Sequence, residues 1–208
     1  MSLEETMSEY QKLHQMMFPY RYALRIVRAK LESVDDELKS ENGHSPIHMI
    51  QSRIKSPNSI LEKLERKHLS KDIHGMEQLN DIAGLRVVCH YINDIQYIAQ
   101  LLVLHDDIEL VKKMNYIDYP KDNGYRSLHL VVKVPVHMQL QTIQVPVEIQ
   151  LRTIAMDCWA SLEHELQYKN RQIIDEDISK RLKICANRIA ETDLEMQKVY
   201  QEIKAKEK

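Results

Sequence analysis

The sequence predicts a helix-rich α/β protein, and periodicity and composition are the evidence for it. Every second residue from Val145 to Arg152 is apolar, which is typical of a strand with one buried face, and Leu128 to Val134 follows the same rule. Other segments repeat their apolar residues at helical spacing. With 29% charged and 43% hydrophobic residues but only 4 Gly and 6 Pro, the chain of 208 residues does not suit a sandwich or a solenoid.

The N-terminal part is expected to be helical. A helix is predicted from about Ser8 to Lys39, and Pro19 either interrupts it or starts a new one. A short helix is predicted from Pro46 to about Lys55. The next helix has a clear beginning, because Ser56 is a good N-cap and Pro57 suits the first helical position.

The helix that begins at Pro57 has an apolar and a cationic side. Ile60, Leu61 and Leu64 are expected to face the core. Cations and a hydroxyl precede the helix or share its other side: Arg53, Lys55, Ser59, Lys63 and Arg66. A helix start offers free N–H groups and a positive dipole end, so this is a sensible place for a triphosphate, whereas a merely solvated lysine face is the alternative.

The middle of the chain is predicted to alternate strands and helices. A strand is expected within Asp81–Cys89, and a helix within Asn93–His105, capped by Asn93 or Asp94. A strand within Ile108–Ile117 follows, and then a polar loop over 118–124 that is rich in turn-forming residues.

Two carboxylates are expected near the ends of strands in one sheet. The apolar residues of the strand ending at Arg152 are odd-numbered, so Glu148 and Gln150 point away from the core, and His129 does the same on the neighbouring strand. Asp81 and Glu148 could hold a hard divalent ion beside nucleotide phosphates, for which Mg²⁺ is the natural metal. The alternative is structural: both acids simply pair with arginines, Arg86 or Arg152.

Two helices are predicted to end the chain. Thr153 caps the first, which runs to about Lys169 and has a predicted buried stripe of Ile154, Cys158, Trp159, Leu162 and Leu166. The second runs from Asp177 to about Lys206. Its apolar seam has the a/d spacing of helix–helix packing and comprises Ile178, Leu182, Cys185, Ile189, Thr192, Met196, Val199 and Ile203. The seam packs either on its own domain or on another subunit.

Composition limits location and partners. The formal charge of −2 gives no global reason to expect a nucleic-acid substrate. The N-terminus lacks the features of a signal peptide and no apolar run has membrane length, so a cytoplasmic protein without membrane contact is expected. Cys89, Cys158 and Cys185 are odd in number and far apart, so we expect three small core residues and no disulfide or zinc framework.

Four motifs occur in order between about residues 45 and 170. They are Arg53-x-Lys55-x-x-x-Ser59-x-x-x-Lys63-x-x-Arg66, Asp81-Ile-Ala-Gly-Leu-Arg86, Tyr119-Pro-Lys121-x-Asn-Gly-Tyr125-Arg-Ser-Leu-His129 and Glu148-Ile-Gln-Leu-Arg-Thr153. Through them the segment closely resembles the synthetase domain of the RelA/SpoT alarmone enzymes. The short chain is similar to the single-domain small alarmone synthetases.

This resemblance implies an architecture. It implies a mixed, about five-stranded sheet flanked by helices, of the nucleotidyltransferase-like synthetase type. Residues 1–44 would form an N-terminal helical extension, 45–170 the synthetase domain, and 171–208 a C-terminal helix for interaction or oligomerisation. The small synthetases are symmetric homotetramers, so the resemblance also implies a homotetramer.

The resemblance further implies the reaction. Pyrophosphate would pass from ATP to the ribose 3′-hydroxyl of GDP or GTP, giving AMP and ppGpp or pppGpp for stringent-response signalling. Arg53 and Arg86 would sandwich the adenine, and planar guanidinium groups suit that stacking. The ATP phosphates would be held by Lys55, Ser59, Lys63 and Arg66.

The resemblance also implies roles around the acceptor. Asp81 and Glu148 would bind Mg²⁺, and Glu148 would be the base for the 3′-hydroxyl. Tyr125 would stack on the guanine base. Lys121 and His129 would lie near the acceptor phosphates, and Gln150 would orient the site. Where some relatives carry Asn, this chain has Asp157, whose carboxylate can accept hydrogen bonds from guanine.

Three other functions fit the sequence less well. The pair His105-Asp106 lacks the further ligands of an HD-type hydrolase. The stretch Asp175-Glu176-Asp177 lies ahead of a helix and is better explained by the helix dipole than as a polymerase-β-like acidic pair. A non-catalytic guanine-nucleotide or RNA-binding regulator is the alternative from another class, but it would be expected to lose a carboxylate, and both are present.

Overall fold

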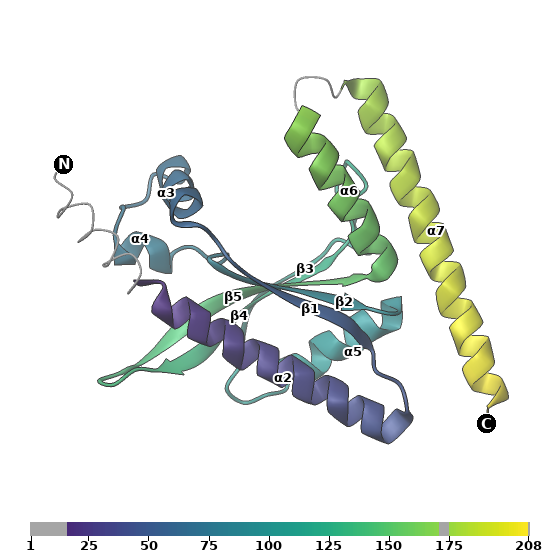
Figure 1. Ribbon diagram of the computed structural model, residues 1–208, viewed down its shortest axis with the longest axis horizontal. Helices are drawn as coiled ribbons and strands as arrows, with labels where there is room; N and C mark the ends of the chain where they lie inside the picture. Colours follow the sequence, from purple (N-terminus) through teal and green to yellow (C-terminus); the bar gives the residue numbers. More distant parts are fainter. Residues whose placement is uncertain (1–15, 171–174, 208) are drawn as a thin grey trace.

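The protein folds around one mixed five-stranded sheet (Figure 1). The computed structural model describes residues 16–170 and 175–207. The strands lie in the order β1-β2-β5-β4-β3, in which β2 and β5 are parallel and every other neighbouring pair is antiparallel. They are β1 (Ile47–Ile54), β2 (Ala83–Cys89), β3 (Glu109–Asn115), β4 (Leu128–His137) and β5 (Thr142–Thr153). The mixed five-stranded sheet that the resemblance implied is confirmed.

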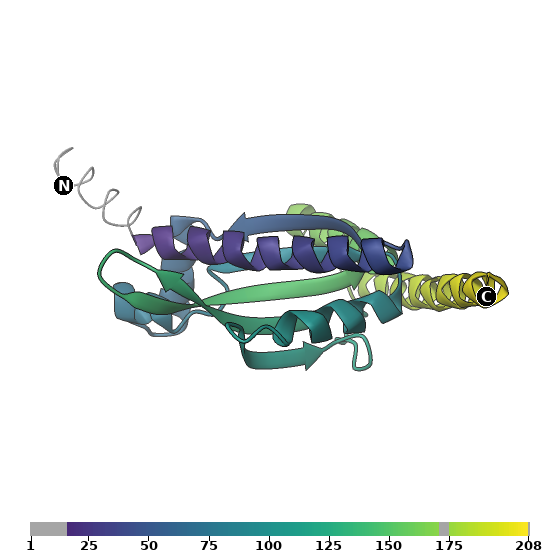
Figure 2. The ribbon, with the colours of Figure 1, turned by 90° about the horizontal axis from the view of Figure 1, so that it is seen from below.

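Helices lie on both faces of this sheet. They are α2 (Phe18–Asn42), α3 (Pro57–Arg66), α4 (Ile73–Glu77), α5 (Ile92–Val103), α6 (Ile154–Asn170) and α7 (Glu176–Lys206). Figure 1 shows α2 and α5 below the sheet and α3 and α6 above it. In Figure 2, seen from below, α2 and α5 lie side by side across the sheet.

The core lies between the sheet and the pair α2 and α5. Val147, Ile149 and Leu151 of β5 have no exposed surface, as the alternation along this strand predicts. They belong to one apolar cluster with Leu31 of α2 and Ile98 of α5. Because these odd-numbered residues fill the core, the even-numbered polar residues of β5 lie on the opposite face, between α3 and α6.

The prediction of a short helix from Pro46 to about Lys55 is wrong, because this segment forms strand β1. It pairs antiparallel with β2 along the edge of the sheet, with Arg53 opposite Gly84. Most of its residues are exposed or half-buried, so the apolar alternation of a buried strand is missing from the sequence. Pairing with β2, a contact distant in sequence, decides its conformation.

Two helix starts fall close to their predicted places. Ser56 caps α3 and accepts a hydrogen bond from the backbone N–H of Ser59, as predicted, although Leu61 is more exposed than predicted. The cap of α5 differs, because Tyr91 is the N-cap. Asp94 lies in the first turn and accepts the backbone N–H of Tyr91 at 3.1 Å.

The predicted buried stripe of α6 is largely wrong. Thr153 does cap the helix, accepting the backbone N–H of Met156 at 3.1 Å, and Trp159 is buried. The other members of the stripe, Ile154, Cys158, Leu162 and Leu166, are exposed. Helix α6 leaves the sheet after its first turns and then packs on α7. Most of its surface therefore contacts neither the sheet nor α7.

The seam predicted on α7 is divided between two environments. Leu182 and Ile189 pack against Trp159, so this part contacts its own domain. Met196, Val199 and Ile203 are 43% to 55% exposed. The three cysteines also differ from the prediction, because Cys89 is buried whereas Cys158 and Cys185 are exposed. The predicted helix over residues 8–15 lies outside the described residues.

Candidate active site

A polar cavity of about 370 Å³ opens on the sheet face opposite α2 and α5. Its lining is Gln51, Ser52, Arg53, Lys55, Asp81, Gly84, Leu85, Arg86, Glu148 and Gln150. The strand register explains this grouping, because Gly84 lies beside Glu148 and Arg86 beside Gln150 in the parallel pair β2–β5. Gly84 has no side chain to fill the space between Arg53 and Glu148. Six predicted site residues therefore meet in one cavity.

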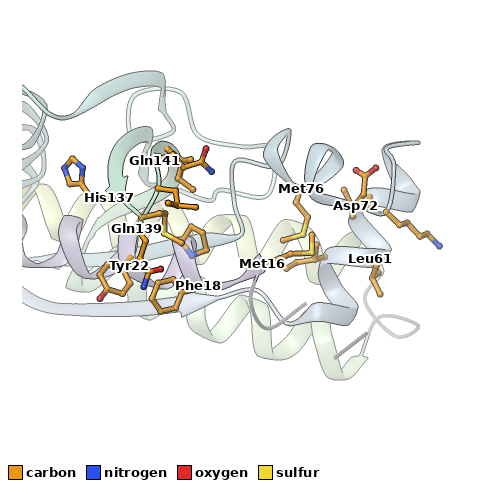
Figure 3. Close-up of a pocket in the computed structure, with 16 residues that line it drawn as sticks. Met16, Phe18, Tyr22, Leu61, Asp72, Met76, His137, Gln139 and Gln141 are labelled. Carbon is orange, nitrogen blue, oxygen red and sulfur yellow. The ribbon is translucent and has the colours of Figure 1, made fainter. Parts of the chain in front are cut away.

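A larger cavity of about 1350 Å³ lies elsewhere, between the start of α2, the α3–α4 region and the β4–β5 hairpin. Figure 3 shows Phe18, Tyr22, Leu61 and Met76 around it. Asp72 is drawn in the same view, but its carboxylate is occupied in capping α4, where it accepts the N–H of Gly75 at 3.0 Å. None of the predicted site residues lines this groove, so the smaller cavity is the candidate active site.

Two lysines hold Asp81 immediately ahead of β2. Its Oδ2 accepts hydrogen bonds from Nζ of Lys55, at 2.6 Å, and from Nζ of Lys63. Burial raises the pKa of Asp81, but these hydrogen bonds and charges outweigh burial and hold it below its ordinary value. The other oxygen, Oδ1, is buried and accepts no hydrogen bond from any residue that the structure describes. Asp81 is thus a fixed carboxylate with one unused ligand atom.

Glu148 is the second carboxylate of the cavity. Its Oε1 lies 3.5 Å from Nδ1 of His129, and its Oε2 accepts a hydrogen bond from Nε2 of Gln150 at 3.2 Å. Burial raises its pKa, but His129 and Gln150 outweigh burial and lower it, whereas the charge of Asp81 acts to raise it. The two carboxylates therefore influence each other electrostatically across the cavity.

A closed ring of hydrogen bonds orients Glu148. Nη2 of Arg152 donates to the Tyr125 hydroxyl at 2.6 Å and to Oε1 of Gln150 at 2.8 Å, and the Tyr125 hydroxyl lies 2.8 Å from Nε2 of His129. Arg152 can only donate, so the Tyr125 hydroxyl oxygen accepts from it and the hydroxyl proton remains available to Nε2 of His129. Four of the five contacts in this ring are hydrogen bonds, and the fifth is the 3.5 Å contact between His129 and Glu148.

Arg152 is the functional residue that the sequence did not assign to the site. It is 5% exposed, and the signal that could have found it is its place in the alternation with Glu148 and Gln150. Its Nη1 also donates to Oδ1 of Asp157 at 3.1 Å, and Nη1 of Arg86 lies 3.4 Å from the same oxygen. The structural alternative is thus wrong, because the two arginines pair with Asp157 and not with Asp81 or Glu148.

The remaining predicted residues surround this centre at different distances. Lys121 places Nζ 4.8 Å from the ring centres of both Tyr116 and Tyr125, a cation–π geometry. Ser59 and Arg66 lie on α3 but do not line the cavity, and Arg66 is exposed at the end of the helix. The residues predicted to bind the acceptor are therefore linked to the carboxylates, whereas part of the predicted donor set lies at the margin of the cavity.

Paired carboxylates among lysines and arginines are the equipment of phosphoryl transfer, in which positioning and charge neutralisation supply most of the catalysis. The comparisons with known proteins agree. Residues 52–173 match the family described as the region found in RelA / SpoT proteins. The chain therefore belongs to the RelA/SpoT family, and the prediction from the four motifs is confirmed.

Individual relatives are similar over most of the chain. Identity is 40% over 168 residues to the GTP pyrophosphokinase YwaC of Bacillus subtilis, covering 80% of each protein. The small alarmone synthetase 1 of Bacillus subtilis bound to its product pppGpp matches with a TM-score of 0.85 and 37% identity over 93% of this chain and 98% of that one. The same synthetase bound to AMPCPP matches with a TM-score of 0.78 and 33% identity, over 94% and 99%.

Proposed function

We propose that this protein is a pyrophosphokinase that transfers the β,γ-pyrophosphate of ATP to the ribose 3′-hydroxyl of GDP or GTP. The products are AMP and ppGpp or pppGpp, which serve stringent-response signalling. The observation that carries the proposal is the pair Asp81 and Glu148 facing one cavity, with Lys55 and Lys63 on the first acid. The pyrophosphokinase name of the relative YwaC and the synthetase structures with pppGpp and AMPCPP support it.

The donor nucleotide is assigned to the side of the cavity formed by β1, β2 and α3. Arg53 and Arg86 flank Gly84 there, and their planar guanidinium groups suit an adenine ring. The triphosphate is assigned to Lys55, Ser59, Lys63 and Arg66. Phosphates that bind Lys55 and Lys63 draw these lysines from Asp81, so ATP binding frees both oxygens of that carboxylate.

Mg²⁺ fits the acidic pair. Asp81 has a buried oxygen without a hydrogen bond, and Glu148 is close enough for the two charges to interact. Two carboxylates plus substrate phosphates are a usual set of Mg²⁺ ligands. Bound by Asp81 and Glu148, the ion would neutralise charge on the transferred group. Removal of divalent ions with EDTA is expected to abolish synthesis, and added Mg²⁺ to restore it.

The acceptor is assigned to the side of the cavity formed by β4, β5 and α6. Tyr125 stacks on guanine, Lys121 and His129 face the acceptor phosphates, and Gln150 orients Glu148. Both arginine contacts of Asp157 use Oδ1, so Oδ2 is the atom assigned to the guanine N–H groups.

Glu148 is the assigned base. Its lowered pKa keeps it ionised at neutral pH, so it can accept the proton of the 3′-hydroxyl. The 3′-oxygen then bonds to the β-phosphorus of ATP. The bond from that phosphorus to the oxygen that bridges the α- and β-phosphates breaks, and AMP leaves with this oxygen and the electron pair.

A homotetramer in the cytoplasm is the assembly and location that we infer. Exposed apolar residues on α7 support a subunit interface, and the tetramer rests on the resemblance. The described helices include none long and apolar enough to cross a membrane. We retain the division into an extension over 1–44, a synthetase domain over 45–170 and a C-terminal helix over 171–208.

The test is a single incubation of the pure protein with Mg²⁺, GDP and ATP labelled at the β- or γ-phosphate. The label is expected in a guanosine nucleotide with a 3′-pyrophosphate, with AMP as co-product. Release of ADP or inorganic phosphate as the main product would identify a kinase or a hydrolase. Binding of both nucleotides without turnover would favour the non-catalytic regulator.

A further inference from the structure

Helix α7 holds the loop that carries the acceptor residues. Arg126 follows Tyr125 directly and turns toward α7. Its Nη2 donates to Oδ1 of Asn187 at 3.1 Å, and its Nη1 donates to the Ala186 carbonyl at 3.5 Å. Nη1 also donates to the Gly124 carbonyl at 3.0 Å, within the loop itself. One guanidinium thus joins the loop to the helix.

Loop and helix are also in direct contact at Gly124. Its φ is +92°, and a Cβ at this position would lie 2.6 Å from the Cβ of Ala186, which is buried. The nearest atom is the short side chain of a buried alanine and not the end of a flexible one, so any larger residue at position 124 would force the loop and α7 apart. The loop is therefore seated on α7 from both sides of Tyr125.

The Tyr125 ring itself also packs beside α7. Tyr125 packs against the buried cluster of Trp159, Ala160 and Ala186, and Nε1 of Trp159 donates to the Leu182 carbonyl of α7 at 3.0 Å. On its other side the Tyr125 hydroxyl belongs to the hydrogen-bond ring around Glu148. A displacement of the loop along α7 would therefore move both the stacking surface and the hydroxyl.

We propose that Arg126 is a positioning residue for the acceptor nucleotide, which acts by fixing Tyr125 against α7. Arg126 touches α7 and its own loop, and it acts on the guanine nucleotide through Tyr125. The inference rests on the proposed function, because it takes Tyr125 as the guanine-binding residue. It extends the acceptor site to Asn187 and Ala186, two residues of the C-terminal helix.

Arg126→Ala and Asn187→Ala test the proposal. Each is expected to raise the KM for GDP and to weaken GDP binding in calorimetry by about tenfold, since each removes a hydrogen bond to a charged group. The KM and Kd for ATP are expected to stay unchanged. Combining both changes is expected to cost little more than Arg126→Ala alone, because they remove the same contact.

Arg126→Lys and Arg188→Ala complete the experiment. Lysine keeps the positive charge and a donor group but lacks the fork of the guanidinium, so Arg126→Lys is expected to recover part of the GDP affinity. Arg188 is an exposed arginine of the same helix, and its replacement is expected to change nothing. Unchanged GDP affinity in Arg126→Ala, or equal weakening of ATP and GDP, would overturn the proposal. Absence of turnover and of GDP binding in the unmodified protein would instead overturn the proposed function.

Discussion

The hydroxyl of Tyr125 and Nε2 of His129 lie 2.8 Å apart, and this contact joins the acceptor loop to the assigned base. His129 faces Glu148 with its other nitrogen at 3.5 Å, so the position of the loop is transmitted to the carboxylate through one imidazole. Arg152 closes the ring through Gln150. The residue assigned to guanine and the assigned base therefore belong to one connected network of side chains.

Glu148→Gln is expected to lower turnover by about 100-fold or more while the fold survives, because the amide is nearly isosteric but can neither accept the proton nor bind Mg²⁺ strongly. Steady-state rates of AMP formation, with thermal unfolding as the control, would measure this. Near-normal turnover would remove Glu148 from the mechanism. A large loss of thermal stability would mean that the residue is structural.

Tyr125→Phe and Tyr125→Ala are expected to separate two roles of this side chain. Phenylalanine keeps the ring but loses the hydroxyl between Arg152 and His129, so kcat is expected to fall about tenfold with GDP affinity retained. Alanine also removes the stacking surface, which is expected to weaken GDP binding by about 1–3 kcal/mol, by analogy with base stacking in nucleic-acid complexes. Calorimetry with GDP and with ATP would distinguish the two. Equal weakening of both nucleotides by either variant would contradict the assignment.

The orientation of Glu148 could be predicted from the sequence, whereas the pairing of the surrounding cations with acids could not. Alternation along β5 decides which face each residue occupies, so Glu148, Gln150 and Arg152 were correctly placed opposite the core. Which cation pairs with which acid depends on the register between β2 and β5 and on where α6 begins. That information is not local, and so the contact of Arg86 with Asp157 could not be predicted.

Helix surfaces were predicted less well for a related reason. An apolar stripe predicts that a helix packs on something, but not over what length. Helix α6 meets the sheet only near Met156, so Leu162 and Leu166 remain exposed although their spacing is right. Strand β1 differs, because a strand at the edge of the sheet buries few of its residues. Its sequence therefore lacks the apolar alternation by which a strand is recognised.

Asp193→Asn is expected to stabilise the protein at neutral pH. Asp193 is buried on α7, where burial raises its pKa although the Thr153 hydroxyl donates to Oδ2 at 2.6 Å. A raised pKa means that the folded state binds the proton more tightly than the unfolded state, so stability falls as pH rises from about 3.8 through the folded pKa. The amide keeps an acceptor for Thr153 without the buried charge.

Thermal unfolding of Asp193→Asn and of the unmodified protein between pH 3 and pH 8 would test this. The difference in Tm is expected to be largest at neutral pH and to disappear when Asp193 is protonated. Glu191→Gln, at an exposed acid in the middle of the same helix, is the control. A lower Tm for Asp193→Asn at pH 7 would show that the charged form makes a net favourable contact.

Assembly is expected to depend on the exposed part of α7 and not on the part that packs on its own domain. Met196 is 55% and Val199 43% exposed, whereas Leu182 and Ile189 are half-buried against Trp159. The double substitution Met196→Asp and Val199→Asp is therefore expected to give smaller, folded species, since charge in an apolar interface opposes association. Leu182→Asp is expected to destabilise the domain itself. Light scattering with thermal unfolding separates these outcomes, and a monomeric mass for the unmodified protein at all concentrations would exclude an α7 interface.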